Sequence, residues 1–183
     1  MYHSLLRNYQ IMVIFIVSLT FNSISARHRH LKVRWGSFDC RVHADFVSEY
    51  KCQVVQPRRS ALNVELNLLQ ELRSIKVYTL ISTKPPSGVI YRKLFDNILD
   101  GCRVISQLSQ KGITSKIYGS VIKSSNQPNK CPIRKGFIYY YNISVEEVMP
   151  SFVPVSHLMT QVNFYAQNQC YLNVTLKGSV MDN

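Results

Sequence analysis

Residues 170–177 read CYLNVTLK, and their strict alternation decides the fold. One face of an extended strand with this sequence carries the apolar side chains, which are Cys170, Leu172, Val174 and Leu176. The other face carries Asn173, whose triplet Asn-Val-Thr is a glycosylation acceptor. A glycan must face solvent and a structural cysteine usually faces the core, so one register satisfies both requirements. The segment therefore predicts a half-buried strand of an antiparallel sheet.

Similar alternation recurs along much of the chain. Apolar and polar residues alternate in LNVELNL, residues 62–68. Further strands are expected at residues 31–35, 52–56, 75–81, 89–95, 136–141 and 158–164. Residues 102–123 instead place apolar residues at helical spacing, with Gly112 dividing two short helices. Seven or eight short strands with one helical crossover predict a mainly β protein, an immunoglobulin-like antiparallel β-sandwich.

Residues 1–26 have the order of a secretory signal peptide. Arg7 precedes the uncharged apolar run IMVIFIVSLTF, residues 11–21, and small residues surround the expected cut after Ala26. As a helix this run spans only about 16 Å, which is too short for a bilayer core of roughly 30 Å. We therefore expect a secreted, extracellular protein with one domain at residues 27–183, glycosylated at Asn142 and Asn173.

The chain is strongly basic, with 22 Lys and Arg residues against 10 Asp and Glu residues and a net charge of +12. In an intracellular chain this excess would favour nucleic acid as the partner. Export shifts the expectation from nucleic acid to anionic partners outside the cell, such as lipid head groups, acidic glycans or an acidic protein surface. A second reading is that the charge only keeps a secreted protein soluble.

Export also makes disulfides the default state of the five cysteines. Cys102 lies at the start of the helical stretch and Cys131 precedes the next strand. A Cys102–Cys131 bond would therefore link the helical crossover covalently to the edge of the sandwich. A second bond is expected from Cys170 to Cys40 or Cys52, with Cys40 preferred. One cysteine is then left over. No C-x-x-C pair is present, which argues against a zinc cluster or a redox site.

Catalytic motifs are missing from the sequence. It has no G-x-S-x-G turn, no H-E-x-x-H motif and no phosphate-binding glycine loop. The few acidic residues make a paired-carboxylate site improbable on composition, and Asp100 is expected to cap the following helix. We therefore expect a protein without catalytic residues, metal or cofactor.

The middle of the chain carries an ordered set of features. They are Asp100-Gly-Cys102, Asn126, Cys131-Pro132, Lys135-Gly136 with aromatic residues after it, and MPSFVP at residues 149–154. In order and spacing they resemble a family of exported insect proteins of unknown function that includes the Che-type chemosensory proteins. The resemblance covers roughly residues 38–180, and the family carries cysteines at both Cys102 and Cys131. That family is in turn similar to the ML lipid-recognition domains and the ganglioside activator protein.

The resemblance implies a sandwich whose sheets part at one end to hold a lipid or another apolar small molecule, with a chemosensory role. The inward positions that would line such a pocket are Leu66, Leu68, Val77, Phe137, Tyr139, Val162, Phe164 and Leu172. For each of them alone, ordinary core packing is the better explanation, so the pocket rests on the resemblance. The alternative function is an extracellular interaction module whose basic face binds a membrane receptor, a glycan or a membrane surface.

Overall fold

The computed structural model describes residues 31–55, 57–58, 60–109, 112–150 and 152–182, so the expected signal peptide at residues 1–26 lies outside the described residues. The elements follow in this order: β1 (Leu31–Val42), β2 (Val47–Val54), β3 (Leu62–Leu68), β4 (Lys76–Lys84), β5 (Arg92–Asp100), α2 (Gly101–Ser106), α3 (Ile113–Lys123), β6 (Gly136–Ile143), the 3-10 helix η1 (Glu146–Val148), β7 (Ser156–Ala166) and β8 (Gln169–Asp182). The described chain is therefore mainly β, with one helical crossover between β5 and β6.

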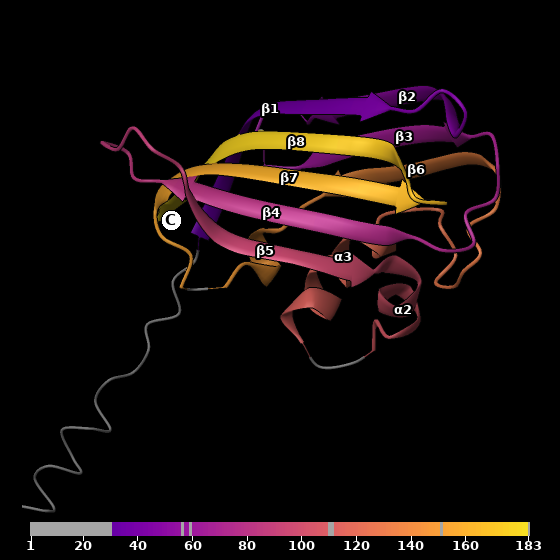
Figure 1. The fold of residues 1–183 in the computed structure, drawn as a ribbon. Coiled ribbons are helices and arrows are strands. Elements are labelled where there is room, and N and C mark those ends of the chain that lie inside the picture. Colours follow the sequence, from indigo (N-terminus) through magenta and orange to yellow (C-terminus); the bar gives the residue numbers. More distant parts are fainter. Residues whose placement is uncertain (1–30, 56, 59, 110–111, 151, 183) are drawn as a thin grey trace, which may run out of the picture.

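The strands form two antiparallel sheets that pack face to face (Figure 1). The larger sheet has the order β1-β8-β7-β4-β5, and the smaller has the order β2-β3-β6. This arrangement confirms the predicted antiparallel β-sandwich. One expected strand is displaced, because the segment predicted at residues 89–95 pairs only from Arg92 onward. The preceding residues follow the double proline at Pro85 and Pro86 and belong to the β4–β5 connection.

The core lies where the two sheets face each other. Alternate residues of β3 point inward and are buried, as are Leu172, Val174 and Leu176 of β8. Trp35 of β1 is also buried, at 3 % exposure. The strand expected at residues 170–177 is therefore confirmed. Tyr171 departs from the alternation and is buried beside Leu172, at a point where the β7–β8 register shifts.

Two disulfides join the elements at opposite edges of the sandwich. The predicted Cys102–Cys131 bond is present and ties the start of α2 to the loop before β6. Cys40 bonds to Cys52, so that β1 of one sheet is tied to β2 of the other, and Cys170 is a free thiol.

The expected Cys40–Cys170 bond is therefore wrong. Cys40 lies opposite Val174 in the β1–β8 ladder, four residues along the strand from Cys170. Four strand residues span about 13 Å, whereas the two Cα atoms of a disulfide lie no more than about 7 Å apart.

The two sheets differ in their number of strands, and the helices lie opposite the strands of the larger sheet that the smaller sheet does not face. β2 contacts β1, so the smaller sheet faces the β1 side of the larger one, and α2 contacts β4 and β5 (Figure 1). α2 begins where expected, because the Asp100 carboxylate accepts a hydrogen bond of 3.0 Å from the Arg103 amide. Short helices thus cover the part of the larger sheet that the three strands leave open.

Candidate functional site

The inner face of β4, β5 and β7 is where the sandwich is incompletely covered. In the ladders, Thr79 lies opposite Val162, Ile81 lies opposite Phe95, and Val77 lies opposite Phe164, so these residues share the inward face. All except Val77 are half-buried or more exposed, with Phe95 at 39 %. We call Thr79, Ile81, Phe95, Val162 and Phe164 the open inner face.

The rest of the interior is closed by comparison. Leu66 and Leu68 of β3 are 5 % and 4 % exposed, and Leu172 of β8 is 5 % exposed. These residues have a sheet on each side, whereas β4 and β5 have short helices opposite them. The open inner face is therefore a consequence of pairing a five-stranded sheet with a three-stranded one.

Helix α3 places a hydroxyl group against this face. The Tyr118 hydroxyl lies 3.3 Å from Oγ1 of Thr79, within hydrogen-bonding distance. Burial raises the pKa of the Tyr118 phenol above its usual value, and the hydrogen bond with Thr79 opposes that shift only in part. The phenol is therefore neutral at physiological pH. The pair adds neutral polar groups to a face that also carries the uncharged side chains of Asn97, opposite Thr79, and Thr160, opposite Ile81.

An aromatic cluster joins the open inner face to the closed core. The rings of Phe164 and Tyr171 lie 6.2 Å apart, and those of Tyr171 and Phe46 lie 5.9 Å apart. Phe46 is 1 % exposed, and burial raises the pKa of the Tyr171 phenol far above its usual value. One wall of the candidate site is thus fixed by packing against the centre of the protein.

The structure divides the eight residues that were expected to line a pocket into three groups. Val162 and Phe164 lie on the open inner face. The closed core contains Leu66, Leu68, Val77 and Leu172. Phe137 and Tyr139 lie on the outer face of the smaller sheet, so their assignment to the interior is wrong.

The error at Phe137 and Tyr139 has a simple cause. Residues 137–141 read FIYYY. Because all five are apolar or aromatic, the sequence does not show which alternate residues face the core and which face outward. Ile138 pairs with buried Leu66, and this pairing places Ile138 on the inward face of β6. The outer face of β6 consequently carries Phe137, Tyr139 and Tyr141 in a row, with the Tyr139 and Tyr141 rings stacked 4.6 Å apart.

Four residues of the candidate site were not among the eight that were expected to line a pocket: Thr79, Ile81, Phe95 and Tyr118. The alternation at residues 75–81 places Thr79 on the same face as Val77, which was a usable signal. The helical spacing likewise includes Tyr118. No pattern in the sequence says that α3 lies against β4, so their contact required the structure.

The two glycosylation acceptors differ in their surroundings. Asn142 is exposed at the end of β6, with a φ angle of 57° and its amide nitrogen 2.7 Å from Oδ1 of Asn63. Asn173 is half-buried on the outer face of the larger sheet, where its side-chain amide donates a hydrogen bond to the Asn163 side chain. Asn173 thus has the outward orientation that the strand register predicted.

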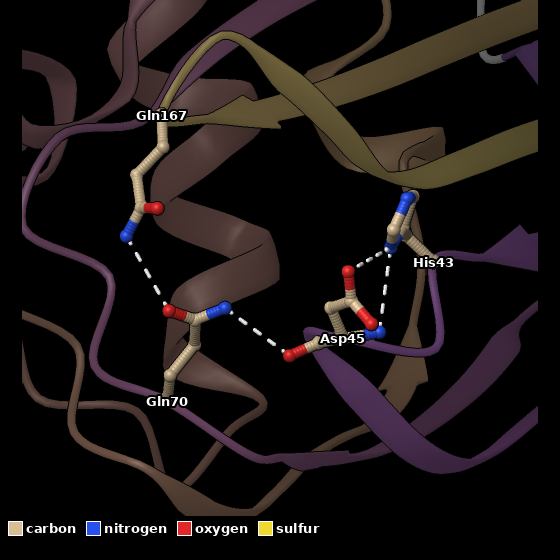
Figure 2. A network of polar contacts seen from close by, with 4 residues as sticks. All are labelled: His43, Asp45, Gln70 and Gln167. Atoms are coloured by element: carbon tan, nitrogen blue, oxygen red, sulfur yellow. Dashed lines mark hydrogen bonds and ion pairs between the residues drawn. The ribbon is translucent and has the colours of Figure 1, made fainter.

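Polar contacts hold together three connections at one end of the sandwich (Figure 2). Gln167 Nε2 donates to Gln70 Oε1 over 3.3 Å, and Gln70 Nε2 donates to the Asp45 carbonyl over 3.1 Å. Asp45 Oδ2 lies 3.7 Å from Nδ1 of His43. The two glutamines border a surface hollow of about 550 Å³ that also contains Arg73 and Lys76. This exposed network connects the β1–β2, β3–β4 and β7–β8 turns.

Within the described part of the chain, no group of three or more His, Cys, Asp or Glu residues could hold a metal ion. Among the same residues, no helix is both long and apolar enough to cross a membrane.

Residues 80–159 match the family described as "Protein of unknown function (DUF1091)". The matched segment runs from the middle of β4 through β5, α2, α3 and β6 to the start of β7, and contains Ile81 and Phe95 of the open inner face. The match agrees with the expected resemblance to a family of unknown function. No curated protein matches the chain.

Proposed function

We propose that the protein binds a lipid or another apolar small molecule on the open inner face, between the larger sheet and α3. The observation that carries the proposal is the incomplete burial of Ile81, Val162 and Phe164, which point into the sandwich and pack against the core and yet keep contact with solvent. Apolar side chains in such a position gain free energy when a hydrocarbon covers them, at about 25 cal/mol per Å² of buried area.

The nature of the site also limits the ligand. The open inner face has a neutral hydroxyl pair, Thr79 and Tyr118, and hydrocarbon side chains. The half-buried Asn97, opposite Thr79, and Thr160, opposite Ile81, point the same way and are also uncharged. A ligand that is mostly hydrocarbon with few and uncharged hydrogen-bonding groups suits this composition, since a charged group would lose hydration without gaining a partner of opposite charge. An acyl chain with an uncharged end or a long-chain alcohol is of this kind.

Other observations support the proposal. The resemblance to ML lipid-recognition domains implies a ligand between the sheets, which is where the open inner face lies. The Cys40–Cys52 and Cys102–Cys131 bonds support folding in an oxidising compartment, as a secreted carrier requires. We therefore propose a secreted binding protein without catalytic activity. Native mass spectrometry of protein secreted from eukaryotic cells tests this, with a retained lipid mass as the expected result.

Enlarging a side chain on the open inner face should block the ligand. We expect Val162→Trp to weaken binding of the fluorescent apolar probe N-phenyl-1-naphthylamine by about tenfold. The free energy of unfolding should fall by no more than about 1 kcal/mol, because a half-exposed site can accommodate the indole, whereas overpacking a filled core costs about 1–3 kcal/mol. Fluorescence titration and urea unfolding measure the two effects.

Gln161→Trp is the matched control, since Gln161 adjoins Val162 on β7 but shares the outer face with Thr175. It should leave probe binding unchanged. A loss of about 1–3 kcal/mol in Val162→Trp, together with no probe binding by the unaltered protein, would mean that the interior is filled and the proposed function is wrong.

Probe binding should not depend on pH. The open inner face contains no histidine or carboxylate, and burial moves the pKa of Tyr118 upward, away from neutrality. Tyr118 therefore keeps its proton at every pH below its ordinary value of about 10. The affinity for N-phenyl-1-naphthylamine at about pH 5.5 and about pH 8.5 should agree within about twofold. A larger change, measured by titration at constant ionic strength, would place a charged group in the site.

A further inference from the structure

A second hollow, of about 670 Å³, lies between the loop that precedes β6 and the start of that strand. Its lining includes three cations, Lys130, Arg134 and Lys135, and the exposed ring of Phe137. It is separate from the open inner face, because Phe137 lies on the outer side of the smaller sheet. We call it the basic hollow.

The neutral and acidic polar groups of the basic hollow are already engaged. Asn126 donates to the Phe137 carbonyl over 3.0 Å and accepts from the Tyr139 amide over 2.9 Å. Gln127 accepts a hydrogen bond from the buried Tyr140 hydroxyl. The Glu71 carboxylate accepts a hydrogen bond of 2.9 Å from Arg73, which offsets its charge.

The three cations of the basic hollow, unlike its acidic group, are not engaged in ion pairs among the residues that the structure describes. Lys130, Arg134 and Lys135 are exposed, and none of them forms an ion pair with another residue in the described ranges. The basic hollow therefore offers three uncompensated positive charges around a concave surface, together with one apolar ring. Charges of one sign in a concavity attract an anion more strongly than the same charges on a flat surface.

The loop that carries these cations is held in place. Lys130 precedes Cys131, which is bonded to Cys102. Arg134 and Lys135 follow Ile133, which is 5 % exposed and forms two backbone hydrogen bonds with Leu72, of 2.9 and 3.0 Å. Each cation thus stands within two residues of an anchored position. A preordered backbone lowers the conformational entropy that a ligand would otherwise have to remove.

We propose that the basic hollow binds an acidic saccharide, with Lys130, Arg134 and Lys135 receiving its sulfate or carboxylate groups and Phe137 contacting the apolar face of a sugar ring. Phe137 is 55 % exposed, and the next ring along β6, that of Tyr139, lies 6.3 Å from it. An aromatic ring offers a large apolar contact surface that is rigid before binding. The hollow also has the size of a small-molecule site rather than of a site for a single ion.

A saccharide fits these observations better than a membrane surface. Membrane binding combines cations with apolar side chains that protrude beside them. The most exposed apolar residues of the described ranges, Val89 and Ile90, follow β4, whereas Glu71 of the basic hollow precedes it. The nine residues of β4 separate the two places by about 30 Å. This proposal is independent of the apolar ligand proposed above.

The test uses the full disulfide-bonded protein and a size-defined heparin tetrasaccharide, with calorimetry at about 0.15 M salt to limit non-specific attraction. The variant Lys130→Gln/Arg134→Gln/Lys135→Gln should bind at least about tenfold more weakly than the unaltered protein. Its control, Lys32→Gln/Arg34→Gln/Arg41→Gln, removes the same charge from exposed positions on β1 and should bind within about twofold of the unaltered protein. Phe137→Ala should lose affinity several-fold.

A second measurement does not depend on how the variants fold. In the unaltered protein, the tetrasaccharide should protect Lys130 and Lys135 from acetylation while Lys32 and Lys177 react as before. Equal losses in the two triple variants would show that only net charge acts and would overturn the proposal. Binding to vesicles of phosphatidylcholine and phosphatidylserine without binding to the tetrasaccharide would overturn it in favour of a membrane surface.

Discussion

Replacing Cys102 and Cys131 together by alanine is expected to lower the free energy of unfolding by about 3–4 kcal/mol. The two cysteines are 29 residues apart, and closing a loop of this length in the unfolded chain accounts for a stabilisation of that size in the chain-entropy model. The loss is a large share of the roughly 5–15 kcal/mol that holds a typical domain folded. Urea unfolding followed by fluorescence measures it, because the one tryptophan, Trp35, is buried.

The second disulfide provides the control. Cys40→Ala/Cys52→Ala opens a loop of only 12 residues and should cost about 3 kcal/mol. The two double variants should also differ in binding. The Cys102–Cys131 bond holds the crossover that covers the open inner face and the loop of the basic hollow, so its removal should weaken binding of both probes. A Cys102→Ala/Cys131→Ala variant with unchanged stability and binding would show that the bond does not hold the crossover.

The sequence predicted the elements where alternation is unambiguous. LNVELNL coincides with β3, because each of its apolar residues faces the core and each polar residue faces outward. The helical stretch divides as expected, with α2 ending at Ser106 and α3 beginning just after Gly112. Such segments are predictable because their side-chain pattern is imposed by burial on one face alone.

Prediction failed where the outcome depended on pairing between strands. The sequence FIYYY did not show which of its residues face the core, and the pairing of Ile138 with Leu66 determined it. The partner of Cys40 depended on the register of β1 against β8 and on the position of β2, and neither is encoded locally. Alternation of apolar and polar residues identifies the two faces of a strand, but it does not identify the neighbouring strand in the sheet.

The candidate site could be predicted only in part. Val162 and Phe164 were correctly placed inward from their alternation along residues 158–164. Their incomplete burial follows from a sheet of five strands opposite a sheet of three, and local sequence does not reveal how strands divide between sheets. The cations of the basic hollow were visible as composition, while their gathering around one concavity required the fold.

Phe46→Ala is expected to lower the free energy of unfolding by about 3–5 kcal/mol. The Phe46 side chain is 1 % exposed and contacts Tyr171, so its removal leaves a cavity that the two sheets cannot close. Thermal and urea unfolding measure the loss. Phe137→Ala is the same chemical change on the outer face and should cost less than about 1 kcal/mol.

The two phenylalanine variants should also have opposite effects on binding. Phe46 supports Tyr171, which in turn packs against Phe164 of the open inner face. Phe46→Ala should therefore weaken binding of N-phenyl-1-naphthylamine and leave the heparin tetrasaccharide bound, at a temperature where the variant is still folded. Phe137→Ala should leave the apolar probe bound and weaken the tetrasaccharide. If both variants weakened both ligands equally, the two sites would not be separate, because loss at one face would have reached the other through the core.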